Sequence, residues 1–133
     1  MGRGLDSFDR FDWPSLLAGR DILLCAARHA EALKIADGLE AAGARVTIVE
    51  DQTMVPDRLA RGRFSSVIVA LDGDAGPSMQ LCAAVRGVSA RLVLLAPVGR
   101  HAALRTACAE VELAERTISE RALVLFLVGT PDE

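Results

Sequence analysis

Two acidic residues, Asp72 and Asp74, follow the apolar run 67–71 in the glycine-rich stretch "LDGDAG". A carboxylate directly after a buried strand can act as a nucleophile or as a cation ligand, because strand ends border the ligand-binding edge of an α/β sheet. A magnesium ion would need further carboxylates beside it, since a hard cation collects several oxygen ligands. The chemistry open to Asp72 therefore depends on the residues that follow the other strands.

A second candidate group consists of arginines in the C-terminal part of the chain. The guanidinium group is planar and pairs with phosphates, carboxylates and guanine edges. We expect these arginines to lie near one another and to form a ligand-binding face: Arg100, Arg105, Arg116 and Arg121. Glutamates interleave with them in the sequence, so ordinary surface ion pairing is the alternative interpretation.

Other residues that could do chemistry lack a supporting pattern. His29 and His101 each stand at the start of an expected helix without a cysteine or carboxylate cluster, which is typical of surface or capping histidines. Cys25, Cys82 and Cys108 have no CxxC spacing and are expected to be reduced, buried thiols. The glycine-rich nucleotide-binding motifs and the G-x-S-x-G motif of hydrolases do not occur. The sequence predicts no metal site and no cofactor.

Strands and helices alternate along the chain from residue 21. Apolar or β-branched runs predict strands, and helical spacing with glycine stops predicts the helices between them. The expected strands are 21–27, 45–51, 65–71, 90–96 and 111–115, and the expected helices are 29–44, 55–63, 77–87, 99–110 and 119–128. The helix at 77–87 would carry Pro77 in its first turn. Five repeats predict a parallel sheet with helices on both faces.

The last segment allows two interpretations. The run 122–128 alone would pass for a strand, whereas Ser119 as a cap, Glu120 in the first turn and Gly129 at the stop favour a helix. Such a helix is apolar around its circumference. If Leu123, Phe126 and Leu127 face the sheet, another surface must cover a second set: Val124, Leu125 and Val128. That cover is either a docking partner or the chain's own N-terminal segment, through Trp13 or Leu16.

Length and charge restrict the class of protein. The chain has 133 residues, enough for one domain, and its net charge of −3 argues against a general nucleic-acid binder. The apolar runs are too short to span a membrane, and charges occupy the place of a signal-peptide core. We therefore expect a cytoplasmic protein with a lead-in at 1–19, whose Phe8, Phe11 and Trp13 could cover an edge of a domain at 20–133.

The order of elements and the stretch "LKIADGLEAAGARVTIVED" (33–51) resemble the receiver domains of response regulators, a flavodoxin-like (CheY-like) α/β family. The resemblance implies a site for phosphoryl transfer. Receivers carry two magnesium-binding acids after the first strand, a phosphoacceptor aspartate at the end of the third, a threonine or serine after the fourth and a Lys-Pro pair after the fifth. The carboxylate attacks the phosphorus in line while the metal ion and the lysine neutralise the developing charge.

The corresponding positions here carry other residues. Ala26 and Ala27 follow the first strand, and an ungapped alignment on Phe64 and Arg86 puts Ala70 at the phosphoacceptor position. The remaining positions are occupied by Ala96, Glu115 and Arg116. The chain thus resembles a degenerate receiver, or pseudo-receiver, in which Asp72 and Asp74 are solvated loop acids. The alternative is a residually phosphorylatable receiver that uses Asp72.

The resemblance predicts a regulatory role without catalysis. Residues 11–24 look like the junction between a kinase core and an attached receiver in a hybrid histidine kinase. The expected partners are the kinase body or a neighbouring receiver, held by docking or autoinhibition, with neither nucleic acid nor membrane bound. Some pseudo-receivers are thought to bind cyclic dinucleotides, so cyclic di-GMP is the candidate releasing ligand. The alternative is a docking or dimerisation module that binds no small molecule.

Overall fold

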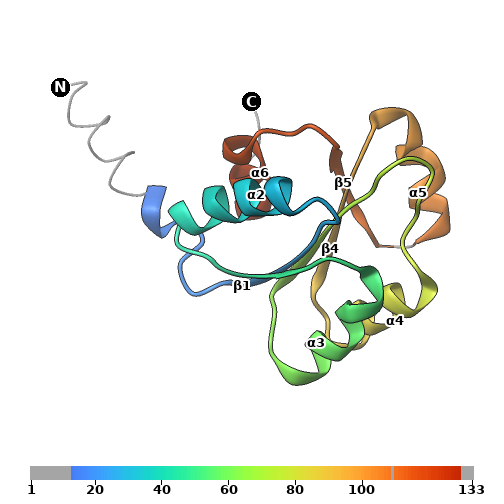
Figure 1. The fold of residues 1–133 in the computed structure, drawn as a ribbon, viewed down its shortest axis with the longest axis horizontal. Coiled ribbons are helices and arrows are strands. Elements are labelled where there is room, and N and C mark those ends of the chain that lie inside the picture. Colours follow the sequence, from blue (N-terminus) through green and yellow to red (C-terminus); the bar gives the residue numbers. More distant parts are fainter. Residues whose placement is uncertain (1–12, 109, 130–133) are drawn as a thin grey trace.

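A computed structural model of the chain describes residues 13–108 and 110–129. Strands and helices alternate along the sequence, as Figure 1 shows. The strands are β1 (Asp21–Cys25), β2 (Arg45–Val49), β3 (Ser66–Ala70), β4 (Arg91–Ala96) and β5 (Glu112–Glu115). The helices are α2 (His29–Ala41), α3 (Val55–Arg61), α4 (Met79–Gly87), α5 (His101–Ala107) and α6 (Glu120–Val128). Short 3-10 turns are η1 (Trp13–Ser15), η2 (Gln52–Met54) and η3 (Val98–Arg100).

The five strands form one parallel sheet in the order β2-β1-β3-β4-β5. Cys25 at the end of β1 pairs with Val49 of β2 and with Val69 of β3. The strand order reverses between β1 and β3, and the carboxyl ends on either side of that point form the usual ligand-binding edge of such a sheet. The predicted flavodoxin-like fold is confirmed.

Most predicted elements have the expected identity, and the differences lie at their ends. The last element is the predicted helix, because the Ser119 hydroxyl accepts the Ala122 N–H and Gly129 takes the left-handed conformation with φ +83°. The expected helix 99–110 is shorter and is preceded by η3. Pro77 does not lie in the first turn of α4, because Ser78 caps that helix by accepting the Leu81 N–H.

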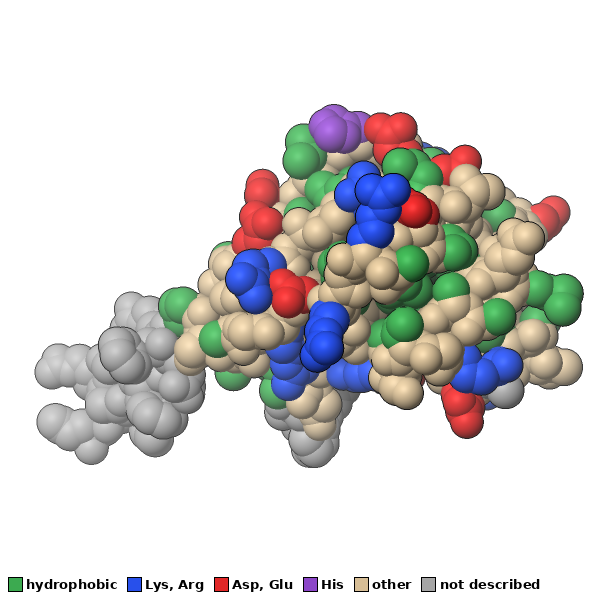
Figure 2. All heavy atoms as spheres, turned by 90° about the horizontal axis from the view of Figure 1, so that it is seen from below, with side chains coloured by type: hydrophobic (Ala, Val, Ile, Leu, Met, Phe, Trp, Pro, Cys, Tyr) green, Lys and Arg blue, Asp and Glu red, His purple; other side chains and the backbone are tan. Residues whose placement is uncertain are grey.

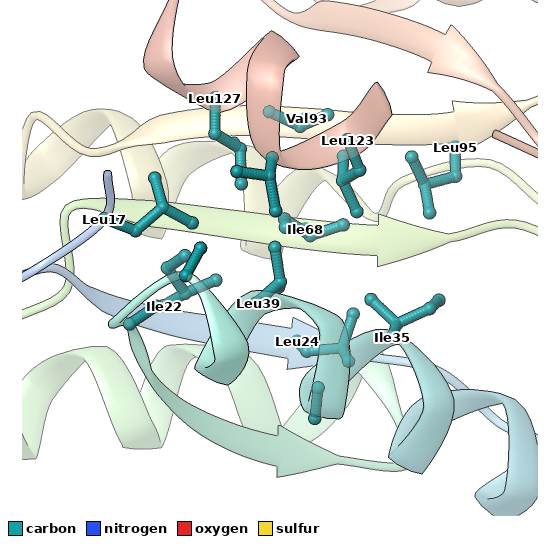
Figure 3. Close-up of a cluster of buried hydrophobic side chains, with 14 of the residues drawn as sticks. Leu17, Ile22, Leu24, Ile35, Leu39, Ile68, Val93, Leu95, Leu123 and Leu127 are labelled. Atoms are coloured by element: carbon teal, nitrogen blue, oxygen red, sulfur yellow. The ribbon is translucent and has the colours of Figure 1, made fainter. Parts of the chain in front are cut away.

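Two hydrophobic cores lie on opposite faces of the sheet. The helices α2 and α6 cover one face, where Ile68 of β3 packs among Leu39 and Leu123 (Figure 3). The two helices approach closely at Gly38, where an added Cβ would lie 2.5 Å from the Cβ of Glu120. The helices α3, α4 and α5 cover the other face, with Leu59, Leu81 and Leu104 buried against it.

The side chains of α6 are covered largely by the chain itself. Val124 is 0% exposed and belongs to the core between α6 and α2, so it is not available as the surface residue that the sequence predicts. Val128 is partly buried against the same core, and Leu125 is also only partly exposed. The helix lies over the sheet beside α2, and this position buries a wider stripe than a single line of residues.

The segment before β1 packs on this core. Leu17 is 0% exposed and its N–H donates to the carbonyl of Ala42, 2.8 Å away, while Trp13 and Leu16 pack against the same cluster. Phe8 and Phe11, expected to cover an edge of the domain, lie outside the described residues. Within residues 13–108 and 110–129, no helix has the length and apolar character to cross a bilayer.

Candidate functional site

Alanines border the carboxyl edge of the sheet at three strand ends. Ala26 and Ala27 directly follow β1, Ala70 is the last residue of β3 and Ala96 is the last residue of β4. Ala26 and Ala96 are buried, at 1% and 0% exposure, and the Ala26 N–H donates to the carbonyl of Val49 at the end of β2. Their methyl groups can neither bind a cation nor form a phosphoryl ester.

Arg116, just after β5, is the side chain that enters this edge. It is 13% exposed, and its Nε donates to the Leu71 carbonyl at 2.9 Å. Its two terminal nitrogens each donate to a carboxylate oxygen of Glu31, and one of them also donates to Asp72 Oδ1 at 2.8 Å. Three segments are thereby joined: the start of α2, the loop after β3 and the loop after β5.

The contact between Arg116 and Glu31 shifts the titration of both groups. The hydrogen bond from Arg116 holds the pKa of the Glu31 carboxyl below its usual range, and burial opposes this shift. The same hydrogen bond, followed by that to Asp72, raises the pKa of the Arg116 guanidinium. Both groups are therefore charged at neutral pH, and the contact between them is an ion pair.

Asp72 differs from the solvated loop acid that the sequence predicts. Its side chain is 41% exposed, so water reaches it, yet it is held by Arg116 and lies 3.9 Å from Arg28 Nη2. Asp74, two residues further on, is exposed. The carboxylate of Asp72 thus faces two cations, one of them largely buried.

The four arginines expected to share a ligand face have different partners. Arg100 donates to the carbonyls of Gly73 and Asp74 at 3.1 and 3.2 Å, so it holds the same loop as Arg116. Arg121 lies over the ring of Trp13, 4.7 Å from its centroid, and Arg105 is exposed on α5. Glu115, which the sequence left open between the pocket and solvent, accepts the backbone N–H of Arg116.

Two hollows flank the Arg116 contact. One, of about 550 Å³, lies between α2 and the start of α6 and is lined by residues of both charges, among them Arg28, Lys34 and Glu120. The other, of about 230 Å³, lies over the ends of β1, β2 and β3: Ala27, Glu50, Asp51, Ala70 and Asp72 line it together with neighbouring residues. The face on the side of α3 and α4 is also mixed in charge, with basic and acidic side chains interspersed (Figure 2).

The residues at this edge do not fit the magnesium site that the resemblance implies. Ala26 and Ala27 offer no side-chain oxygen after β1, the Asp51 carboxylate accepts the Thr53 N–H, and the Asp72 carboxylate is bound by Arg116. Among the described residues, no three or more His, Cys, Asp or Glu side chains are grouped so as to hold a metal ion. Oxygen donors for a hard cation are therefore too few and already engaged.

No protein-family model and no curated protein matches this sequence. Solved structures do match. The chemotaxis protein CheY4 of Vibrio cholerae has a TM-score of 0.71 at 15% identity, over 86% of this chain and 100% of that chain. The receiver domain of a signal transduction histidine kinase from Syntrophus aciditrophicus has a TM-score of 0.69 at 17% identity, over 86% and 96%.

A third solved structure also matches this fold. A mutant receiver domain of the histidine kinase CKI1 from Arabidopsis thaliana has a TM-score of 0.67 at 11% identity, over 90% of this chain and 96% of that chain. The chain has the CheY-like receiver fold. This receiver-like fold covers nearly all of the described residues, and its carboxyl edge is the place where the Arg116 contact lies.

Sequence reasoning did not find the partner of Arg116. Glu31 is an acid in the first turn of a helix, a common position for which the helix dipole is a sufficient explanation. Arg28 directly precedes that helix, and no local pattern marks it as part of a site. The sequence feature that points to this contact is the position of Arg116. An arginine directly after the fifth strand of a parallel sheet can pair with acidic residues near the carboxyl ends of the other strands.

Proposed function

We propose that this chain is a regulatory, receiver-like module of a two-component system that is not switched by phosphorylation of a strand-end aspartate. The observation that carries the proposal is the contact of Arg116 with Glu31 and Asp72 at an edge whose strand ends are alanines. Two arginines, Arg116 and the nearby Arg28, already offset the charge of the Glu31 and Asp72 carboxylates, so no metal ion is needed to balance it.

A module of this kind acts by occupying a surface of its partner. It docks on a histidine kinase body or on a neighbouring receiver in the cytoplasm and holds that partner in one conformation. Release requires a ligand or partner that prefers one of the two states, because only differential binding can shift such an equilibrium. On α6, the partly exposed Leu125 and Val128 are the side chains we assign to docking, whereas the buried Val124 supports the helix from below.

The decisive experiment is a backbone-amide NMR titration of the ¹⁵N-labelled chain with Mg²⁺ and beryllofluoride, a phosphoryl mimic. We expect no magnesium-dependent shifts at residues 70–76, because the metal ligands are missing and Asp72 is engaged by Arg116. The matched control is Asp72→Asn. Magnesium-dependent shifts that this substitution abolishes would overturn the proposal and establish a residually phosphorylatable receiver.

A ligand-gated form of the module, with cyclic di-GMP as the ligand, is the second candidate. Its support is the exposed Arg105 on α5 alone, whereas Arg100, Arg116 and Arg121 have partners inside the chain. We therefore expect spectra that remain unchanged up to millimolar cyclic di-GMP at fixed ionic strength. Saturable shifts at residues 96–121 that Arg105→Gln weakens would instead establish gating by this ligand.

A further inference from the structure

Two cysteines that are far apart in the sequence meet on the face of the sheet opposite α2. Cys82 lies on α4 and Cys108 directly follows α5. Their sulfur atoms are 2.8 Å apart, although the two residues are 26 positions apart in the sequence. Both are thiols rather than a disulfide in this structure. The length of a disulfide bond is about 2.0 Å, so bond formation requires the sulfur atoms to approach by less than about 1 Å.

We propose that Cys82 and Cys108 form a reversible disulfide that makes this side of the domain sensitive to oxidation. The site is independent of the proposed function, because it shares no residue with the Arg116 contact. The backbone around Cys108 is held in place, since its N–H donates to the Leu104 carbonyl at 3.0 Å. Cys82 lies on helix α4, which is anchored by the buried Leu81 and Val85, and Cys108 directly follows α5.

The two thiols differ in access. Cys82 is partly exposed, whereas Cys108 is only 4% exposed. A small cavity of about 40 Å³ borders both, lined also by Val85, Leu92 and two charged residues, Arg86 and Glu110. An oxidant therefore reaches Cys82 first. The Cys108 thiol is then close enough to attack the oxidised Cys82 sulfur.

Glutathione disulfide, as the oxidant, supplies a balanced reaction. The Cys82 thiolate attacks one sulfur of glutathione disulfide, which forms a mixed disulfide and releases one glutathione thiolate. The Cys108 thiolate then attacks the Cys82 sulfur, forms the Cys82–Cys108 bond and releases the second glutathione thiolate. The two cysteine thiols lose two electrons and two protons, and glutathione disulfide gains them as two molecules of glutathione.

The reaction should be slow at neutral pH. Burial, and then the hydrogen bond with Cys108, raises the pKa of the Cys82 thiol to about 12, although Arg86 opposes the shift. The reactive thiolate is therefore scarce, and the initial rate should rise about tenfold per pH unit from 7 to 9. Arg86 on α4 and Glu110 after α5 are the other charged groups at this cavity.

The bond would close a loop that contains β4 and α5. It would tie α4 to the segment that leads from α5 into β5 and restrict the unfolded chain, so the oxidised protein should melt about 5–15 °C higher than the reduced protein. A restraint of this kind fixes the α5 side of the domain without any change at the carboxyl edge of the sheet.

The test is to incubate the full chain with excess glutathione disulfide at pH 8, then denature it, alkylate the remaining thiols and measure its mass. We expect one alkylated cysteine, Cys25, and a link between the peptides that contain Cys82 and Cys108. In Cys108→Ser, Cys82 should stop as the mixed disulfide with one glutathione. In Cys82→Ser, Cys108 should stay a thiol because it is buried. Dithiothreitol should restore three thiols and the lower melting temperature.

The matched control is Cys25→Ala, which removes the buried cysteine of β1 and should leave the link unchanged. Three alkylated thiols in the wild-type chain after prolonged oxidation would overturn the proposal. So would a link that involves Cys25, or a mixed disulfide at Cys82 that never resolves while Cys108 is present. Circular dichroism of each serine variant establishes that the fold is retained, and the Cys82→Ser result remains decisive if Cys108→Ser does not fold.

Discussion

The two edges of the sheet are built differently. At the edge where the strands begin, Leu17 is fully buried, Arg45 pairs with Asp21 across β1 and β2, and Arg91 forms a fork with Glu112 at 2.7 and 2.5 Å across β4 and β5. Arg91 and Arg20 also donate to the Leu127 carbonyl at the end of α6. At the opposite edge, two hollows of about 550 and 230 Å³ flank the largely buried fork of Arg116.

The ion pair of Arg91 with Glu112 joins adjacent strands, whereas the ion pair of Arg116 with Glu31 joins segments that are distant in the sequence. Arg91 and Glu112 stand on adjacent strands and are 34% and 37% exposed, so their pairing supports the register of β4 and β5. Arg116 and Glu31 are 85 positions apart in the sequence, and the arginine is 13% exposed among the carboxyl ends of the strands. The same two residue types join adjacent strands at one edge, and at the other they link separate segments around a largely buried cation.

The largest loss of stability should come from a substitution at the edge where the strands begin. Leu17→Ala removes a fully buried side chain and should lower the free energy of unfolding by about 2–4 kcal/mol. Urea denaturation measures this loss, and Leu33→Ala is the control, because Leu33 is 44% exposed and should cost less than about 0.5 kcal/mol. Equal losses would mean that the segment before β1 does not belong to the core.

Removal of Arg116 should come next. Arg116→Met leaves Glu31 and Asp72 without their main cation and should lower the free energy of unfolding by about 2 kcal/mol, after a discount for their exposure to water. Arg91→Met is the matched variant at the other edge and should cost about 1 kcal/mol, because that pair is more exposed. A smaller loss for Arg116 than for Arg91 would contradict the comparison.

Acid should lower the stability that the ion pairs contribute at both edges. Hydrogen bonds from arginine lower the pKa of Glu31 and of Glu112 in the folded state. A lowered folded pKa gives stability that is fully present above the unfolded value, about 4.3, and is lost as the pH falls through the folded value. Urea midpoints should therefore be flat above about pH 5 and should fall below about pH 4. Glu31→Gln and Glu112→Gln should each make this fall shallower; unchanged slopes in both would show that the pairs do not form.

The smallest effect should be that of Asp72→Asn. Asp72 is 41% exposed and Arg116 keeps Glu31 as a partner, so the loss of unfolding free energy should be about 0.5 kcal/mol. Asp57→Asn, which weakens the exposed pair with Arg61, is the control and should behave alike. A loss above about 2 kcal/mol would mean that Asp72, rather than Glu31, is the main partner of Arg116.

The sequence by itself determined the parts that depend on near neighbours along the chain. The caps at Ser119 and Gly129, the apolar run of β3 and the alanines at the strand ends follow from residues within one or two turns of each other. Alternation of such elements leaves a parallel sheet as the arrangement that buries both of its faces.

Only the tertiary structure decided the pairs that are distant in the sequence. Arg116 with Glu31, Cys82 with Cys108 and Leu17 with Ala42 meet because the strand order and register bring separate segments together. The sequence predicts that α6 is apolar on every side, but whether Val124 meets solvent depends on how α6 lies against α2 and the sheet. A local pattern specifies which element forms, whereas the neighbour of a side chain on that element is fixed by packing across the whole domain.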